Sequence, residues 1–251
     1  MIANLTLGSL TIDCAQAESS RDFYAHFMGW EKTVNSHFPA LTTTSGLLIL
    51  FATTLSYAPP VWPEEPGEQQ KQMHLDFTVE EIPSAVAKAI SLGATKAVAQ
   101  YGGEQFITML DPEGRPFCLC QGQPSEEGSQ FTTVSINIDC PRYETLREFY
   151  AALTPWDQNF HYTTLVPENK MVVHFMGCEG DFVYLPPVYP SEPGKQQKQM
   201  HLTFYVDDLP SAVAEVLRLG GSKVPQQDDN ELYIMMLDTE GHPFALQSRS
   251  P

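Results

Sequence analysis

The stretch Gln69–Phe77 reads Gln-Gln-Lys-Gln-Met-His-Leu-Asp-Phe, and residues 196–204 repeat it with one change, Thr203 in place of Asp76. The two stretches lie 127 positions apart, and the proline-rich stretches before them keep the same spacing. Near the N-terminus the offset is 126, so that Asp13-Cys14 matches Asp139-Cys140. A fixed offset over this length means that the chain is built twice, with one histidine at the same point of each copy.

The division between the copies is predicted where the composition changes. Residues 123–129 are Gln-Pro-Ser-Glu-Glu-Gly-Ser, a polar segment rich in the residues of flexible connections. We therefore expect copy one at residues 1–122, a linker at 123–129 and copy two at 130–251.

Each copy has the same predicted order of elements. Leu10–Cys14 alternates like a half-buried strand, and Glu18–Met28 has apolar residues one turn apart and ends at Gly29, as a helix does. After a proline-rich loop, Met73–Val79 predicts a strand with His74 and Asp76 on one face. A second helix and a hairpin close the copy. The chain is thus predicted to be α+β, with four small strand–helix–strand modules that must pair to bury a core.

Composition excludes some partners. The 251 residues carry 14 Lys and Arg against 31 Asp and Glu, a net charge of −17, which disfavours nucleic acid and anionic lipid as ligands. No apolar run reaches the roughly 20 residues of a membrane helix. Five cysteines without a recognisable secretion signal favour reduced thiols and a cytoplasmic location. A monomer or a homodimer is expected, since the four modules of one chain can pair with one another.

Three motifs carry a resemblance to a known family. Phe23-Tyr24 followed by Gly29-Trp30, the strand from His74 to Val79, and the hairpin from Asp111 to Cys118 resemble the vicinal oxygen chelate superfamily, which includes glyoxalases, bleomycin-resistance proteins and extradiol dioxygenases. The resemblance covers almost the whole chain, twice over, and is nearest to glyoxalase-like domains. It implies four βαβββ modules forming two cup-shaped, mostly antiparallel sheets with helices outside. It also implies that a cup can hold one divalent metal, which acts as a Lewis acid.

The resemblance assigns four ligand positions to each copy, and most carry poor ligands. The positions in copy one are Ser9, Leu50, His74 and Cys118, and those in copy two are Ser135, His174, His201 and Ala245. A zinc site needs at least three protein ligands, so we expect no complete metal site and no cofactor. The alternative is a divalent metal such as zinc, iron or manganese bound through His74, His201 and His174.

Two functions are consistent with these residues. The first is binding of a small, apolar or aromatic molecule without metal, with His74, His201 and Cys118 on the cup faces and Trp62 and Tyr189 on the proline-rich loops beside them. The second is a metal-dependent lyase, isomerase or dioxygenase that uses the two histidines. Whether the protein is an enzyme is left open, as is the pairing of modules within or across the copies.

Overall fold

The computed structural model describes residues 5–35, 37–122, 131–158, 163–168, 171–178, 183–225, 227 and 232–249. The predicted linker, residues 123–129, lies outside the described residues. Copy one contains β1 (Thr6–Cys14), α1 (Ala17–Met28), β2 (Glu31–Thr33), β3 (Ala40–Thr42), β4 (Leu48–Thr53), β5 (Met73–Val79), α2 (Ile82–Ser91), β6 (Thr95–Lys96), a short 3-10 turn (Gly103–Gln105), β7 (Phe106–Leu110) and β8 (Pro116–Gln121). Copy two contains β9 (Phe131–Cys140), α3 (Tyr143–Leu153), β10 (Thr164–Leu165), β11 (Val172–Gly177), β12 (Met200–Val206), α4 (Leu209–Arg218), β13 (Ser222–Lys223), β14 (Tyr233–Leu237) and β15 (Pro243–Ser248).

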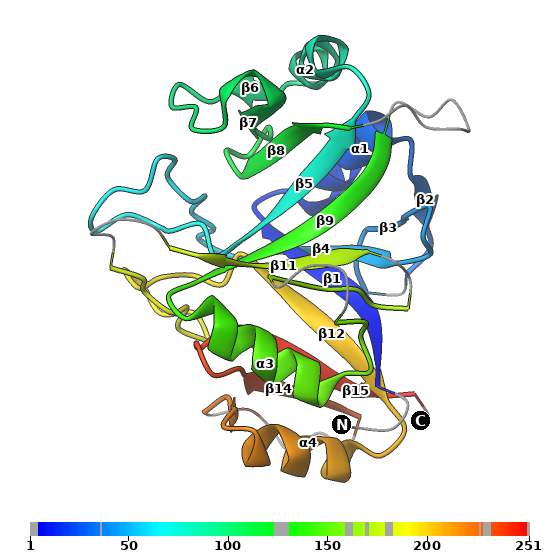
Figure 1. Cartoon of the computed structure of the whole chain (residues 1–251), viewed down its shortest axis with the longest axis vertical. Coiled ribbons are helices and arrows are strands. Elements are labelled where there is room, and N and C mark those ends of the chain that lie inside the picture. Colours follow the sequence, from blue (N-terminus) through cyan, green and yellow to red (C-terminus); the bar gives the residue numbers. More distant parts are fainter. Residues whose placement is uncertain are drawn as a thin grey trace.

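The predicted α+β fold of four strand–helix–strand modules is confirmed. The modules build two mixed, mostly antiparallel sheets (Figure 1). Sheet A has the strand order β13-β14-β15-β12-β1-β4-β3-β2, and sheet B has the order β10-β11-β9-β5-β8-β7-β6. No helix among the described residues combines the length and apolarity needed to cross a bilayer.

The modules pair across the copies. β1 of copy one lies antiparallel to β12 of copy two, and β5 of copy one lies antiparallel to β9 of copy two. Each sheet therefore joins one module from each copy. This answers the pairing question that the sequence left open, and it decides which side chains can share a site.

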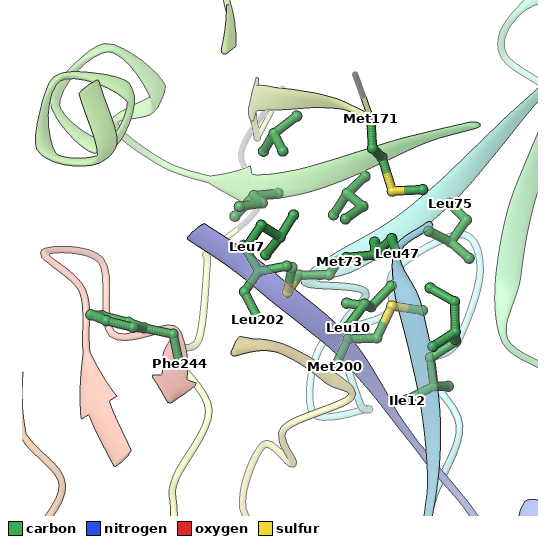
Figure 2. Close-up of a cluster of buried hydrophobic side chains, with 14 of the residues drawn as sticks. Leu7, Leu10, Ile12, Leu47, Met73, Leu75, Met171, Met200, Leu202 and Phe244 are labelled. Atoms are coloured by element: carbon green, nitrogen blue, oxygen red, sulfur yellow. The ribbon is translucent and has the colours of Figure 1, made fainter. Parts of the chain in front are cut away.

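The apolar faces of the two sheets share one core. Figure 2 shows side chains of β1, β5 and β12 meeting there, among them Leu10, Leu75 and Leu202. The aromatic residues of α1 and α3 also bridge the sheets: Tyr24 stacks on Phe51 of sheet A and lies against Phe77 of sheet B. Because the apolar faces are turned to each other, the alternation of each strand turns the polar faces away from this core.

The duplicated glutamines join the two copies. The backbone N–H of Gln70 donates to Oε1 of Gln196 at 2.7 Å, and Nε2 of Gln196 donates back to the Gln70 carbonyl at 3.1 Å. The backbone N–H of Gln197 donates to Oε1 of Gln69 at 2.6 Å. We call these contacts the glutamine junction; it holds the loop before β5 beside the loop before β12 (Figure 1, cyan and yellow). The near-identical sequences of the two stretches make this junction nearly symmetric.

Candidate functional site

The polar face of sheet B carries a row of potential ligands across four neighbouring strands. In register, Thr108 of β7 faces Cys118 of β8, Cys118 faces Asp76 of β5, and Asp76 faces Ser135 of β9. Facing residues of adjacent strands point to the same side of a sheet, so these four side chains lie side by side. Three strands from copy one and one from copy two thus contribute to the row.

A second row runs beside the first. His74 of β5 faces Asn137 of β9, which faces His174 of β11. His74 and Asn137 are buried, and His174 is half-buried. The cross-copy pairing therefore brings His74, Cys118 and His174 to one sheet. In the sequence, His74 and Cys118 belong to copy one and His174 belongs to copy two.

The corresponding rows of sheet A have lost most of these groups. Met235 faces Ala245, Ala245 faces Thr203, and Thr203 faces Ser9. In the second row, His201 faces Thr11, which faces Leu50. His201 is thus the remaining imidazole of this face, and it lies on a different sheet from His74.

His74 is held by charged groups from both copies. Its Nδ1 lies 3.2 Å from Oδ2 of Asp139 and 3.1 Å from Nζ of Lys71, and Lys71 forms an ion pair of 2.6 Å with the same Asp139 oxygen. Burial alone would raise the pKa of Asp139, but Lys71 and His74 hold it below its ordinary value. Burial would likewise lower the pKa of Lys71, yet Asp139 raises it. The pair is therefore ionised, and it fixes the ring from its Nδ1 side.

The other ring nitrogen of His74 points to a cluster of potential metal ligands. Its Nε2 lies 3.4 Å from Oδ1 of Asp76, and one donor atom each of His74, Asp76 and Cys118 lie within 4.8 Å of one another. Oδ1 of Asp76 is buried and has no hydrogen-bond partner. Burial, followed by the charge of Asp76, raises the pKa of the Cys118 thiol far above its usual range. A proton or a cation is needed between these groups.

These residues fit a divalent cation. An Asp139 carboxylate that accepts from Nδ1–H leaves the Nε2 lone pair of His74 free, which is the usual arrangement around a metal-bound imidazole. Imidazole, carboxylate and thiolate are all zinc ligands, and zinc-to-ligand bonds are about 2.0–2.3 Å. The donor atoms lie within 4.8 Å of one another, and two donors at that limit are farther apart than two such bonds span, so small side-chain rotations would have to close the set. A bound cation would give the buried Oδ1 of Asp76 the partner that it lacks in hydrogen bonding.

A second buried polar atom lacks a partner on the same face. Nδ2 of Asn137 has no hydrogen bond, although the residue is 98% buried, since only 2% of its surface is exposed. An amide donor left unsatisfied costs free energy unless a ligand or water meets it. The face thus offers a free donor next to the acidic cluster, and the spacing of the repeats gave no signal for it.

The loop before β5 adds a tryptophan and a carboxylate over sheet B. The Trp62 indole N–H donates to the Ala99 carbonyl at 3.2 Å, and its ring lies 5.5 Å from Nζ of Lys71. Glu64 lies close enough to Lys71, Asp139 and His74 to interact with them electrically, and burial raises its pKa. We did not predict Glu64; the available signal was that copy two has Ser191 at this position.

The polar face of sheet A is closed by its own side chains. Tyr189 packs with Tyr233 against the buried Met235 and Ala245, and the Tyr233 hydroxyl donates to the Met235 sulfur at 3.0 Å. Burial, with the Lys198 ammonium as second cause, lowers the pKa of His201 well below 6.5. His201 is consequently neutral at pH 7. Trp62 and Tyr189 both lie over a lysine ammonium, at 5.5 and 5.7 Å, but Tyr189 packs in this apolar cluster whereas Trp62 is hydrogen-bonded to the Ala99 carbonyl.

A buried hydrogen-bonded turn lies behind Asp13 in sheet A and behind Asp139 in sheet B. Arg115 pairs with Asp111 at 2.9 Å and donates to the Asp13 carbonyl. At the equivalent point of copy two, the His242 ring lies 3.1 Å from the Asp238 carboxylate and 3.0 Å from the Asp139 carbonyl. Nε2 also lies 2.7 Å from the Tyr184 hydroxyl, which can donate or accept. Burial would lower the pKa of His242, but the Asp238 carboxylate raises it, which favours a cationic ring in the place of the arginine.

Comparison with known proteins agrees with this architecture. Residues 9–120 and 135–247 match the family described as glyoxalase-like domain. Glyoxalase I from Zea mays is 12% identical, with 97% of this chain and 92% of that chain covered and a TM-score of 0.64. A mutant of the same maize enzyme is 10% identical, with 98% of this chain and 94% of that chain covered and a TM-score of 0.60. At such identities the likeness concerns the fold alone. No curated protein matches the chain.

Proposed function

The chain belongs to the glyoxalase-like domain family of the vicinal oxygen chelate superfamily, and on this premise we propose that it binds one divalent cation together with a small molecule on the polar face of sheet B. The observation that carries the proposal is the buried Oδ1 of Asp76, which has no hydrogen bond and lies 3.4 Å from Nε2 of His74, beside Cys118. With Asp76, the donor set reaches the three protein ligands that a zinc site needs. The four ligand positions that the family resemblance assigns to copy one do not include Asp76.

The residues divide into ligands and supporting groups. His74, Asp76 and Cys118 would hold the cation, and the thiolate favours zinc over magnesium or manganese. A bound divalent cation would supply Lewis-acid polarisation of an oxygen on the small molecule. Asp139 and Lys71 orient the His74 ring, and Asn137 is free to donate to an acceptor on the ligand.

Glu64 completes the proposed division of roles. Burial raises its pKa, and its place over the charged cluster suits a carboxyl group that exchanges a proton with a bound ligand. Trp62, fixed by its hydrogen bond to Ala99, offers a flat apolar surface at the same end of the sheet. The ligand is therefore proposed to be a small molecule with both polar oxygens and an apolar part. Lyase, isomerase and dioxygenase chemistry all remain compatible with this arrangement.

Metal-free binding is the second candidate. One observation favours it: the Lys71 ammonium lies 3.1 Å from His74 Nδ1, and a second cation nearby opposes binding of a metal ion. In that case Asp76 and Asn137 would contact the small molecule directly.

Zinc content and zinc affinity separate the two candidates. Protein purified without an affinity tag is expected to hold one equivalent of zinc, or to take up one after treatment with chelator. Asp76→Thr, which installs the residue of sheet A, removes a proposed ligand and is expected to weaken zinc binding by more than the roughly 10–100-fold that is lost with an outer-shell partner. The matched change Thr203→Val should leave it unaltered. A wild-type protein that takes up no zinc while a metabolite still raises its Tm would favour the metal-free candidate.

A further inference from the structure

The two polar faces share a common framework. Lys198 forms an ion pair with Asp13, and its Nζ lies 3.1 Å from Nδ1 of His201, as Lys71 does with Asp139 and His74. Both sheets therefore keep the lysine–aspartate ion pair and the contact of the lysine with the histidine, while the 3.2 Å contact between histidine and aspartate is seen at His74 and Asp139 of sheet B. A purely structural role explains the shared contacts in sheet A, where the neighbouring donors are missing.

The differences that touch the proposed ligands lie in one cross-strand row, although the second row also differs, with Thr11 and Leu50 where sheet B has Asn137 and His174. Asp76, Thr108 and Cys118 of sheet B correspond, at the constant offset of 127, to Thr203, Met235 and Ala245 of sheet A. Two of the three exchanges remove a metal ligand. The third replaces a small hydroxyl, 4.0 Å from the Cys118 sulfur, by a long thioether.

The thioether occupies the space that the donors leave. Met235 is 3% exposed and packs with Val224 and Ala245 beneath Tyr189. A buried apolar cluster of this kind excludes water and gives a cation no partner. In sheet A, the loss of ligands and the filling of their space therefore go together.

We infer that sheet A carries a disabled copy of the sheet B site, and that Thr203, Met235 and Ala245 are the residues that disable it. This inference rests on the proposed function. It states that the protein binds one cation per chain although its fold contains two equivalent frameworks. It also states that three substitutions restore the second site, because Lys198, Asp13 and His201 already stand where their counterparts stand in sheet B.

The test is a titration with Co²⁺ alone, followed by thiolate-to-cobalt absorbance and by bound metal after dialysis. Wild-type protein is expected to bind one equivalent. The triple variant Thr203→Asp, Met235→Thr, Ala245→Cys is expected to bind two and to double the thiolate absorbance. A folded triple variant that still binds one equivalent overturns the inference, and so does a wild-type protein that binds two. A wild-type protein that binds none refutes the proposed function itself, and the inference falls with it.

Two single variants keep the test decisive if the triple variant does not fold. His74→Ala is expected to abolish Co²⁺ binding, whereas His201→Ala should retain one full equivalent. Loss of cobalt in His201→Ala would show that sheet A contributes ligands, and would overturn the inference while leaving cation binding intact. Circular dichroism of each variant establishes that it is folded.

Discussion

At the scale of single residues, the position of the proton on His74 decides whether the ring can bind a cation. Lys71 can only donate, so it favours a bare Nδ1, which places the proton on Nε2 facing Asp76. Asp139 can only accept while it is ionised, so it favours a proton on Nδ1 and a free lone pair on Nε2. Both neighbours touch the same nitrogen. A cation at Nε2 would select the state in which the proton is on Nδ1 and the lone pair of Nε2 is free.

Removing the acceptor should therefore weaken cation binding without touching a ligand. We expect Asp139→Asn to lower zinc affinity by about 10–100-fold, the usual effect of losing a group that orients a metal-bound histidine. Asp13→Asn, which breaks the equivalent ion pair in sheet A, is the control and should leave the affinity unchanged. Equal losses in both variants would show that the effect is general destabilisation.

The charge on His242 predicts a dependence of stability on pH. Burial alone would lower the pKa of His242, but Asp238 raises it above the unfolded value of 6.5. The folded state therefore binds the proton more tightly, so the stabilisation is complete below pH 6.5 and is lost as the pH rises through the folded pKa. The difference in Tm between wild type and His242→Gln should shrink as the pH increases. A constant difference from acidic to alkaline pH would contradict a cationic His242.

At the scale of elements, the start of α1 depends on a distant turn. Its N-cap residue, Gln16, makes no side-chain capping bond. Instead Glu113, in the turn between β7 and β8, accepts hydrogen bonds from the backbone N–H groups of Ala15 and Gln16 at 2.9 and 2.7 Å. A carboxylate near a helix N-terminus also interacts favourably with the helix dipole. The contact joins the two modules of copy one.

Loss of this cap should have a measurable cost. Glu113→Ala is expected to reduce the free energy of unfolding by about 0.5–2 kcal/mol, the range found for removed N-caps. Glu18→Ala, in the exposed first turn of the same helix, is the control, and should change it by no more than about 0.5 kcal/mol. Urea unfolding measures both variants, and similar values for the two would argue against capping by Glu113.

At the scale of the whole molecule, neither copy can complete a sheet alone. Copy one contains β1 and β5. The antiparallel partner of β1 is β12 and that of β5 is β9, and both partners belong to copy two. The glutamine junction and the Lys71–Asp139 ion pair also cross between the copies. The chain therefore corresponds to an intertwined pair of copies rather than to two independent units in line.

Separated copies should accordingly fail as monomers. Residues 1–122 produced alone would leave β1 and β5 as open edges, which are templates for pairing with another chain. We expect this fragment to form dimers or aggregates, and to yield a 1:1 complex when it is produced together with residues 130–251. Light scattering during size-exclusion chromatography measures the masses. A monomeric fragment with a sharp thermal transition would contradict the cross-copy arrangement.

Much of the fold could be predicted because it depends on local periodicity. The predicted helix Glu18–Met28 agrees with α1, and the predicted strand Met73–Val79 agrees with β5 in every residue. Which strand lies beside β5 could not be predicted, since strands of equal alternation compete equally for it. That choice depends on contacts far apart in the sequence, such as the glutamine junction.

The site was harder to predict for the same reason. Comparing the copies residue by residue left Asp76 either specific to copy one or an ordinary solvated strand residue, since Thr203 replaces it in copy two. The sheets mix the copies, so one face can keep a function that the other loses. Asn137 and Glu64 carried no motif, and their importance follows only from burial and position.

Anomalous X-ray scattering at the zinc absorption edge, from a crystal of the zinc-loaded protein, locates the proposed cation. We expect a single peak per chain on the polar face of sheet B, at about 2.0–2.3 Å from Nε2 of His74 and Sγ of Cys118 and beside the Asp76 carboxylate. A peak at His201, or a loaded crystal without a peak between His74, Asp76 and Cys118, would contradict this expectation.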